Sequence, residues 1–463
     1  MMVVVLALSG CARGGVDSSG NADRSVGAKE PAAERGRVIV FGIDGGDWQV
    51  IDPLIASGRM PAMARVVREG ASGVLMSMEP SASPSLWTTI ATGVGPDRHG
   101  IHGFIVPGPG GAGPKTDDRG GEAEAGEGAG GAHTDVRPVT SGMRRSPAFW
   151  NILGQFDRKS GVVGWLVTWP AEPIDGFIVS SYLPYLYNWS TGRPLKGTIV
   201  EGIPRQTFPE GLLDEVSALK VRPTELDDSL LRRFYDPNRI GALLPADREC
   251  VTGFRWSLAC DETYARIARR LFDKYPVDLF AVYFGGSDVA SHRFWKFAHP
   301  EAMPYGVRPD DAAVLGGVID AYYVYLDGLL GEYMARMGPG DTVVVLSDHG
   351  FKPVMIPGRP NTSGHHRMEG IVALWGRGVR PGARITDARL VDILPTLLEL
   401  LGLPAADGLE GRPLAGALDP SFVAAHPPRH VPGYKDKSGP RGPESSDLDQ
   451  NVLERLRSLG YID

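Results

Sequence analysis

This 463-residue sequence contains few cysteines and few long apolar runs, and its basic residues do not outnumber the acidic ones. Its three cysteines leave room for one disulfide bridge at most. Forty-eight Lys and Arg against 55 Asp and Glu give a formal net charge of -7, so the basic footprint of a nucleic-acid-binding protein is absent and no nucleic-acid partner is expected. The apolar run at residues 1–8 is too short to cross a bilayer as a helix.

That N-terminal run ends in Leu8-Ser9-Gly10-Cys11, which resembles the lipobox of bacterial lipoproteins. The motif predicts lipid on Cys11 and an exported protein, periplasmic or at the cell surface, that reaches the membrane only through this anchor. No Lys or Arg precedes the run, so the alternatives are a true start further upstream or an accidental match. With Cys11 lipidated, Cys250 and Cys260 remain as a pair that could form a disulfide or stay two buried thiols.

Changes in composition divide the chain into segments. These are a lipoprotein signal at 1–11, a flexible Gly- and Ser-rich tether at 12–36, a folded domain at 37–418 and a C-terminal extension at 419–463. Within the domain, residues 107–135 are rich in glycine and too poor in apolar residues to offset the entropy of ordering, so we predict a disordered insertion there. Residues 175–247 have an irregular pattern, which suits either a cap on the substrate side or a packed insertion.

Side chains that can bind metal ions follow predicted buried strands. The apolar run Val343–Leu346 leads to Asp348 and His349, and the run Val38–Ile43 leads to Asp44. Because ligands of open α/β sheets bind at the carboxyl ends of the strands, we expect these side chains to face one site. Taken singly, each has a plainer interpretation, as a turn residue or as the cap of the next helix.

A third apolar run, Val277–Phe284, leads to Asp288 and His292. If a helix begins there, the two side chains stand at positions i and i+4 on one face, a spacing that suits two ligands of one metal ion. The plainer interpretation is two unlinked surface residues. Further along, His365 and His366 precede another predicted strand, and either of them could be a ligand.

Hydroxyl groups are concentrated in residues 80–93, a pattern typical of a loop that enters a helix. Most of them are expected to cap that helix, but a serine at a helix N-terminus also suits an anionic substrate. Together the chain offers three carboxylates, three imidazoles and one hydroxyl, enough for two divalent ions and a nucleophile. Mixed Asp and His ligands favour zinc, and manganese is also compatible.

The order and spacing of these residues resemble the type I phosphodiesterase/nucleotide pyrophosphatase family of the alkaline phosphatase superfamily, over most of residues 37–415. Asp44, in the sequence Ile-Asp-Gly, is similar to the family's first metal aspartate. The run from Thr89 to Ile101 is similar to the segment after the family's nucleophile, which places Ser83 at the nucleophile. The remaining matches are Asp288 with His292, Asp348 with His349, and His366 before Arg-Met-Glu-Gly.

This resemblance implies an alkaline-phosphatase-like three-layer α/β/α sandwich with a mostly parallel central sheet and insertions. It also implies a hydrolase of phosphoric esters, in which one ion lowers the pKa of Ser83, a phosphoseryl intermediate forms, and the other ion assists the leaving oxygen and then the hydrolytic water. The ligands it implies are Asp44, Asp348 and His349 for the first ion and Asp288, His292 and His366 for the second.

Two positions depart from the family pattern. Leu86 and Trp87 stand where nucleotide pyrophosphatases carry Asn and His, so a nucleotide substrate is not implied. A formylglycine sulfatase is disfavoured, because Ser81 is followed by Ser83 and Ser85 where that class needs Pro and Arg. The alternative functions are a phosphomonoesterase or phosphotransferase that acts on lipid or glycan head groups, and a non-catalytic surface lipoprotein.

Overall fold

The computed structural model describes residues 36–107, 136–184, 186–187, 197–198, 203–303, 306–354 and 363–435. From Gly36 onward these residues belong to one folded unit. The predicted lipidation site Cys11, the tether up to residue 35, residues 108–135 of the predicted insertion and residues 436–463 of the C-terminal extension lie outside the described residues.

Nine strands form the central sheet, in the order β15-β2-β14-β11-β1-β10-β5-β6-β9. Five of the eight neighbouring pairs are parallel, including the central run from β11 through β6. The other three pairs, β11 with β14, β14 with β2 and β6 with β9, are antiparallel. The strands are β1 (Val38–Ile43), β2 (Ala71–Met76), β5 (Ser160–Val163), β6 (Gly176–Val179), β9 (Thr207–Phe208), β10 (Leu279–Phe284), β11 (Thr342–Leu346), β14 (Glu369–Gly376) and β15 (Ala383–Arg389).

The central strands are buried on both faces. Every residue of β1, β10 and β11 is buried, as expected for near-continuous apolar runs in a parallel sheet. Along β1 the side chains alternate between two hydrophobic clusters: Ile39 and Phe41 lie in one, and Val38 and Val40 lie in the other. The sheet therefore has a core on each side.

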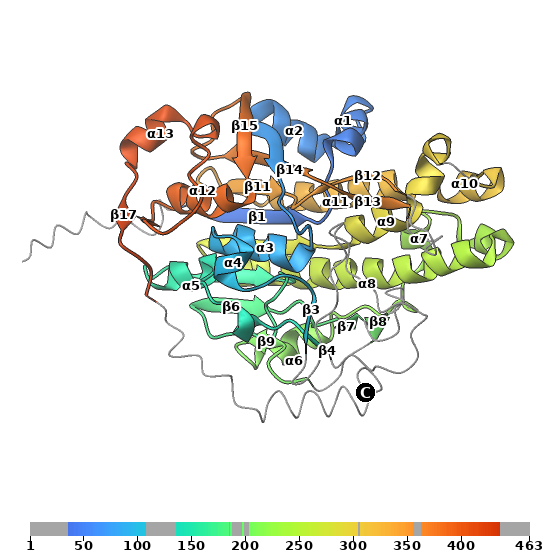
Figure 1. Ribbon diagram of the computed structural model, residues 1–463, viewed down its shortest axis with the longest axis horizontal. Helices are drawn as coiled ribbons and strands as arrows, with labels where there is room; N and C mark the ends of the chain where they lie inside the picture. Colours follow the sequence, from blue (N-terminus) through green and yellow to red (C-terminus); the bar gives the residue numbers. More distant parts are fainter. Residues whose placement is uncertain are drawn as a thin grey trace, which may run out of the picture. The chain divides into compact units, whose positions relative to one another are not determined.

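Helices cover both faces of the sheet (Figure 1). On the Phe41 side, apolar residues of α1 (Trp48–Ala56), α2 (Pro61–Glu69), α8 (Pro245–Lys274), α9 (Gly286–Ala298) and α11 (Val318–Met334) fill the core. On the Val40 side, α3 (Ser83–Thr92), α5 (Phe149–Gly154) and α12 (Ile393–Leu400) do so. This arrangement confirms the predicted three-layer α/β/α fold with a mostly parallel sheet.

Shorter elements complete the described part. The helices are α4 (Pro96–His99), α6 (Leu212–Ser217), α7 (Asp228–Leu231), α10 (Pro309–Leu315) and α13 (Pro420–Ala425), with 3-10 turns at Ser141–Met143, Pro237–Ala242, Pro300–Ala302, Leu390–Asp392 and Ala415–Ala417. Four two-stranded sheets pair β3 (Ile105–Pro107) with β4 (Val136–Pro138), β7 (Leu186–Tyr187) with β8 (Gly197–Thr198), β12 (Gly350–Pro353) with β13 (Gly364–Arg367), and β16 (Ala405–Ala406) with β17 (His430–Val431).

Residues 309–334 form two helices, α10 and α11, with Gly316 and Gly317 between them. The segment Pro309–Met334 has the length and apolar composition of a membrane span, but more than half of its most apolar window is buried inside the protein. Its apolar character therefore has a sufficient explanation in the core, where α11 contributes residues such as Tyr322 and Leu326.

The irregular region at residues 175–247 is largely built into the folded unit. Strands β6 and β9 extend the central sheet, and β6 lies parallel to β5. Between residues 212 and 243, apolar side chains such as Leu212, Leu231 and Phe234 belong to the same core cluster as α8. The described residues of this region therefore contribute to the central sheet and to the core.

Of the two alternatives for Cys250 and Cys260, the disulfide is excluded by the structure. Both residues lie on α8, and Cys260 follows Cys250 by ten positions, which corresponds to roughly 15 Å along the helix axis. A disulfide requires Cα atoms within about 7 Å. Cys250 is instead a buried core residue, and burial raises the pKa of its thiol to about 11.

Candidate functional site

The candidate ligands meet at one edge of the sheet because their strands are neighbours. Strand β1 lies between β11 and β10 and is parallel to both. Asp44 follows β1, Asp348 and His349 follow β11, and β10 leads into α9, which carries Asp288 and His292. The carboxyl ends of three adjacent parallel strands thus bring these side chains together, as ligand sites of open α/β sheets require.

Asp44, Asp348 and His349 form the first group, in which the potential ligand atoms all lie within 4.8 Å of one another. His349 Nε2 is 3.3 Å from Asp44 Oδ1 and 3.5 Å from Asp348 Oδ2. All three residues are buried, with at most 2% of their surface exposed. This group can hold one metal ion.

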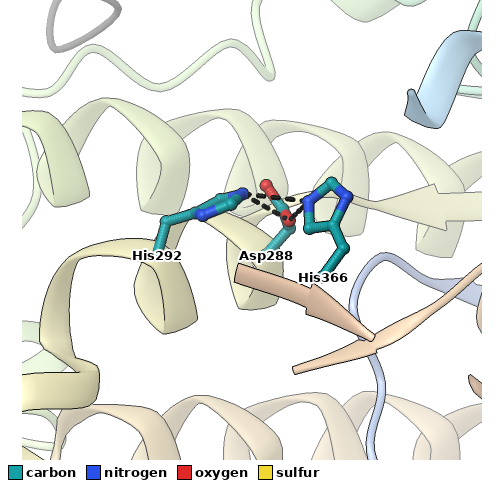
Figure 2. Close-up of side chains that lie close together, drawn as sticks. All are labelled: Asp288, His292 and His366. Carbon is teal, nitrogen blue, oxygen red and sulfur yellow. Dashed lines mark hydrogen bonds and ion pairs between the residues drawn. The ribbon is translucent and has the colours of Figure 1, made fainter. Parts of the chain in front are cut away.

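Asp288, His292 and His366 form the second group (Figure 2). Asp288 Oδ1 is 3.3 Å from the Nε2 atom of His292 and 3.3 Å from that of His366. Asp288 and His292 stand one helical turn apart on α9, as their spacing predicts, whereas His366 comes from β13, which packs beside α9. Their side chains are 14–27% exposed, so the second group lies nearer the solvent than the first.

The structure places His366, and not its neighbour His365, in the second group. In the pairing of β13 with β12, His366 lies opposite Phe351 and His365 lies opposite Lys352. Successive side chains of a strand point to opposite faces. His365 therefore lies beside the group, with its ring centroid 6.3 Å from that of His292. Periodicity alone could not decide which face of this hairpin meets the site.

The two groups adjoin each other. The rings of His349 and His366 stack with centroids 3.6 Å apart, and His349 Nε2 is 3.8 Å from Asp288 Oδ1. The boundary between the groups is therefore formed by His349 of the first group and by Asp288 and His366 of the second. This closeness suits a pair of ions that act on one substrate.

Each histidine is oriented by a backbone carbonyl. Nδ1 of His292 lies 2.8 Å from Gly364 O, Nδ1 of His366 lies 2.9 Å from Ser81 O, and Nδ1 of His349 lies 3.2 Å from Gly350 O. A carbonyl oxygen only accepts hydrogen bonds, so Nδ1 carries the proton and Nε2 presents its lone pair to the group. Metal-binding histidines are typically held in this way.

The donor atoms fit metal ions. His292 Nε2 and His366 Nε2 face each other at 3.0 Å, an arrangement of two lone pairs that a cation between them would stabilise. Among the described residues, Asp288 Oδ1, Asp348 Oδ2 and His349 Nε2 are buried and have no hydrogen-bond partner. Such atoms are costly to leave unsatisfied. Oxygen and imidazole donors of this kind suit zinc or manganese.

The pKa shifts in the first group also favour a bound metal ion. Burial, followed by repulsion from Asp44, raises the pKa of Asp348 well above its ordinary value. Burial lowers the pKa of His349, but attraction from the nearby carboxylates of Asp348 and Asp44 outweighs it and raises the pKa to about 10. The group therefore favours added positive charge, which a divalent ion supplies.

Ser83 lies beside the first group. It is the first residue of α3, and its Oγ is 3.4 Å from Asp44 Oδ1. The residue is only 5% exposed. The structure thus brings together the hydroxyl and all six ligand-type side chains that the sequence singled out.

Leu86 and Trp87, which depart from the family pattern, are core residues and are fully buried. The Trp87 ring stands edge-on to Trp165 at 5.0 Å and to Tyr283 at 4.9 Å. The Tyr283 hydroxyl in turn donates a hydrogen bond to Asp44 Oδ2. Sequence reasoning missed Tyr283, because a tyrosine inside the apolar run of β10 reads as a core residue.

His99 lies outside both groups and has a structural role. Its Nε2 is 3.0 Å from Thr89 Oγ1, and its Nδ1 accepts the backbone N–H of Ile101 at 3.1 Å. An Nδ1 that accepts is unprotonated, so the imidazole is neutral. Burial is the main cause that lowers the pKa of His99 to about 3. These bonds join α4 to the helix that carries Ser83.

We expect His99 to contribute a distinct pH dependence to stability. Its unfolded-state pKa is near 6.5 and its folded-state pKa is about 3. Between these values the unfolded chain binds more protons, so the contribution is present above pH 6.5 and is lost as the pH falls towards 3, by up to about 1.4 kcal/mol per pH unit. Urea unfolding should show a flatter pH dependence for His99→Gln than for the wild type. Equal slopes would contradict this role.

Comparisons with known proteins give partial matches to curated relatives. The chain is 34% identical to the phosphopentomutase of Symbiobacterium thermophilum over 103 residues, 22% of this chain and 24% of that protein. It is 40% identical to the 2,3-bisphosphoglycerate-independent phosphoglycerate mutase of Cereibacter sphaeroides over 80 residues, 17% of this chain and 15% of that protein. The chain thus spans less than a quarter of the length of these relatives.

Two solved structures are similar at low identity. One is a protein in complex with its substrate D-glucosamine-2-N,6-O-disulfate, with 13% identity, 86% of this chain and 81% of the other covered, and a TM-score of 0.41. The other is the phosphonoacetate hydrolase of Sinorhizobium meliloti 1021 in complex with phosphonoacetate, with 18% identity, 70% and 58% covered, and a TM-score of 0.35.

The model of the type I phosphodiesterase/nucleotide pyrophosphatase family matches residues 38–389, from the start of β1 to the end of β15. The matched range includes Ser83 and both ligand groups. Because this match extends over more than half of the 463 residues, the chain belongs to the type I phosphodiesterase/nucleotide pyrophosphatase family.

Proposed function

We propose that this protein is a metal-dependent phosphodiesterase that uses Ser83 as its nucleophile and two divalent ions, zinc or manganese. The observation that carries the proposal is the position of Ser83 Oγ, 3.4 Å from a carboxylate oxygen of the first group, with the second group directly adjoining. Family membership supports hydrolysis of phosphoric esters as the reaction class. Asp44, Asp348 and His349 would hold one ion, and Asp288, His292 and His366 the other.

When bound, two such ions would supply Lewis-acid stabilisation of the attacking and leaving oxygens of an in-line displacement. The chain's own contribution is to fix the reacting groups. Asp44 accepts bonds from Ser83 and Tyr283 on its two different oxygens, which holds the serine hydroxyl at the first group. Attack of Ser83 Oγ on phosphorus would form a phosphoseryl intermediate and expel the alcohol, and water would then regenerate the serine.

The burial of the two groups suggests an orientation for the substrate. The first group and Ser83 are at most 5% exposed, whereas the second group has side chains that are 14–27% exposed. The phosphoryl group would therefore enter above the second group, and the leaving alcohol would face the solvent there. An open leaving-group side places few limits on the size of that alcohol.

An activity screen tests the proposal. The purified protein, loaded with Zn²⁺ or Mn²⁺, is expected to hydrolyse bis-p-nitrophenyl phosphate at least about tenfold faster, in kcat/KM, than p-nitrophenyl phosphate, about 1.4 kcal/mol in transition-state stabilisation. The reverse preference would overturn the diesterase assignment and favour a phosphomonoesterase. Transfer to an added lipid or glycan head group in place of hydrolysis would favour a phosphotransferase. Protein that is purified without bound zinc or manganese, and that shows no turnover when these ions are added, would favour a non-catalytic lipoprotein.

We also propose that the protein is exported and anchored by lipid at Cys11, on the basis of the Leu-Ser-Gly-Cys motif. Membrane fractionation and fatty-acid labelling test the proposed anchor. In a bacterial host, the wild type should partition with the membrane fraction and label with a fatty-acid probe. Cys11→Ser should do neither. Equal labelling of both proteins would overturn the anchor.

A further inference from the structure

A buried carboxylate outside both ligand groups joins the segments that carry them. Asp47 is fully buried and caps α1 by accepting the backbone N–H of Gln49 at 2.7 Å on Oδ1. Its Oδ2 accepts the backbone N–H of Phe351 at 2.8 Å. Arg367 donates to both oxygens, from Nε at 2.8 Å and from Nη2 at 2.7 Å. All four bonds end on one carboxylate.

The partners of Asp47 come from three segments of the site. Asp47 follows Asp44 by three residues in the loop after β1. Phe351 lies two residues after His349, and Arg367 directly follows His366 on β13. The Asp47 carboxylate therefore ties the loop and turn of the first group to the strand that delivers the imidazole of the second group.

Close packing around this contact leaves it little freedom. A Cβ atom on Gly350 would lie 2.7 Å from Asp47 Oδ2 and 2.9 Å from Arg367 Nε, so only glycine fits beside the pair. The planar guanidinium matches both carboxylate oxygens at once, which fixes direction as well as distance. These four bonds occupy both oxygens of Asp47, and Asp47 belongs to neither ligand group.

We infer that Asp47 and Arg367 are positioning residues that set the place of His366, and so of the second ion, relative to the first group. The inference rests on the proposed two-ion function. Loss of Arg367 leaves the bonds of Asp47 to Gln49 and Phe351 in place, so the first group keeps its support. His366 then retains its Nδ1 bond to Ser81 O, its strand pairing and its stack on His349, but loses the anchor of its chain neighbour. The effect should fall on the second ion.

Calorimetric titration of the chelated full chain with Zn²⁺ tests this inference. The wild type is expected to bind two ions. Arg367→Gln should bind the first ion within about threefold of the wild-type affinity and the second about 10–100-fold more weakly, the usual cost of losing an orienting partner. Arg367→Lys should give a smaller loss of affinity for the second ion. Its ammonium keeps the positive charge beside Asp47, but it cannot match both carboxylate oxygens at once.

The control is Arg269→Gln, which removes a bidentate pair with Glu332 between α8 and α11 and contacts neither group. It should leave both affinities unchanged. If Arg367→Gln binds both ions like the wild type, or loses both equally, the inference is overturned while the proposed function stands. If the wild type binds no ions, the proposed function itself fails. Should Arg367→Gln not fold, Arg367→Lys decides by the same criteria.

Discussion

Ser83→Ala is expected to lower kcat for phosphodiester hydrolysis by at least about 10³-fold, because it removes the atom that forms the covalent intermediate. The fold should tolerate the change, since the hydroxyl makes one weak bond, at 3.4 Å, to Asp44. Bound metal should persist, because all six ligand-type side chains remain. Acid quenching of the wild type during turnover should trap on Ser83 the phosphoryl group that still carries the second ester of the substrate, and the variant should trap none.

Ser85→Ala is the matched control for this experiment. Ser85 is a fully buried residue of the same helix, two positions along, and it belongs to neither ligand group. Its replacement should leave kcat within a few-fold of the wild-type value. If Ser83→Ala keeps its activity while Ser85→Ala loses it, the nucleophile is Ser85 and the assignment is wrong.

Removal of the ions is the second change with a large expected effect. Chelation should abolish turnover and lower the thermal unfolding temperature. Ions that bind only the folded state stabilise it by RT ln(1 + [L]/Kd), which is about 4 kcal/mol when the ion concentration is a thousandfold above Kd. The repulsion between the buried Asp44 and Asp348 side chains would then be offset by the His349 imidazole alone. Zn²⁺ or Mn²⁺ should restore both properties, and differential scanning calorimetry with parallel assays measures them.

Ser83→Ala serves as the control for the stability effect. Its ligands are intact, so chelation should shift its unfolding temperature as much as that of the wild type although neither form turns over. His366→Ala should show a smaller shift, because one group of ligands is incomplete. An unchanged unfolding temperature of the wild type on chelation would contradict a structural fit between these groups and metal ions.

Local pattern predicted most of the site, for an identifiable physical reason. The strands before Asp44 and Asp348 are short apolar runs, and parallel strands carry whatever follows them to a common edge. The spacing of Asp288 and His292 needed only a helix to bring them together, and α9 supplies it. Where two faces were open, as for His365 and His366, the pattern could not choose, because the choice depends on how the β12–β13 hairpin is placed.

Features that depend on distant partners were beyond the reach of the sequence. Tyr283 and Asp44 are 239 positions apart, and Arg367 and Asp47 are 320 apart, so no local signal links them. The sequence left a disulfide between Cys250 and Cys260 open, because no helix was assigned to the segment that contains both. Helix α8 holds them apart and so excludes the bond.

Anomalous X-ray scattering from crystals of the zinc-loaded full chain tests the central claim most directly. Two peaks are expected about 3.5–4 Å apart, the usual separation in two-metal sites. One should lie among Asp44, Asp348 and His349, and the other among Asp288, His292 and His366. A single peak, or zinc bound elsewhere with these six side chains hydrogen-bonded to one another, would contradict it.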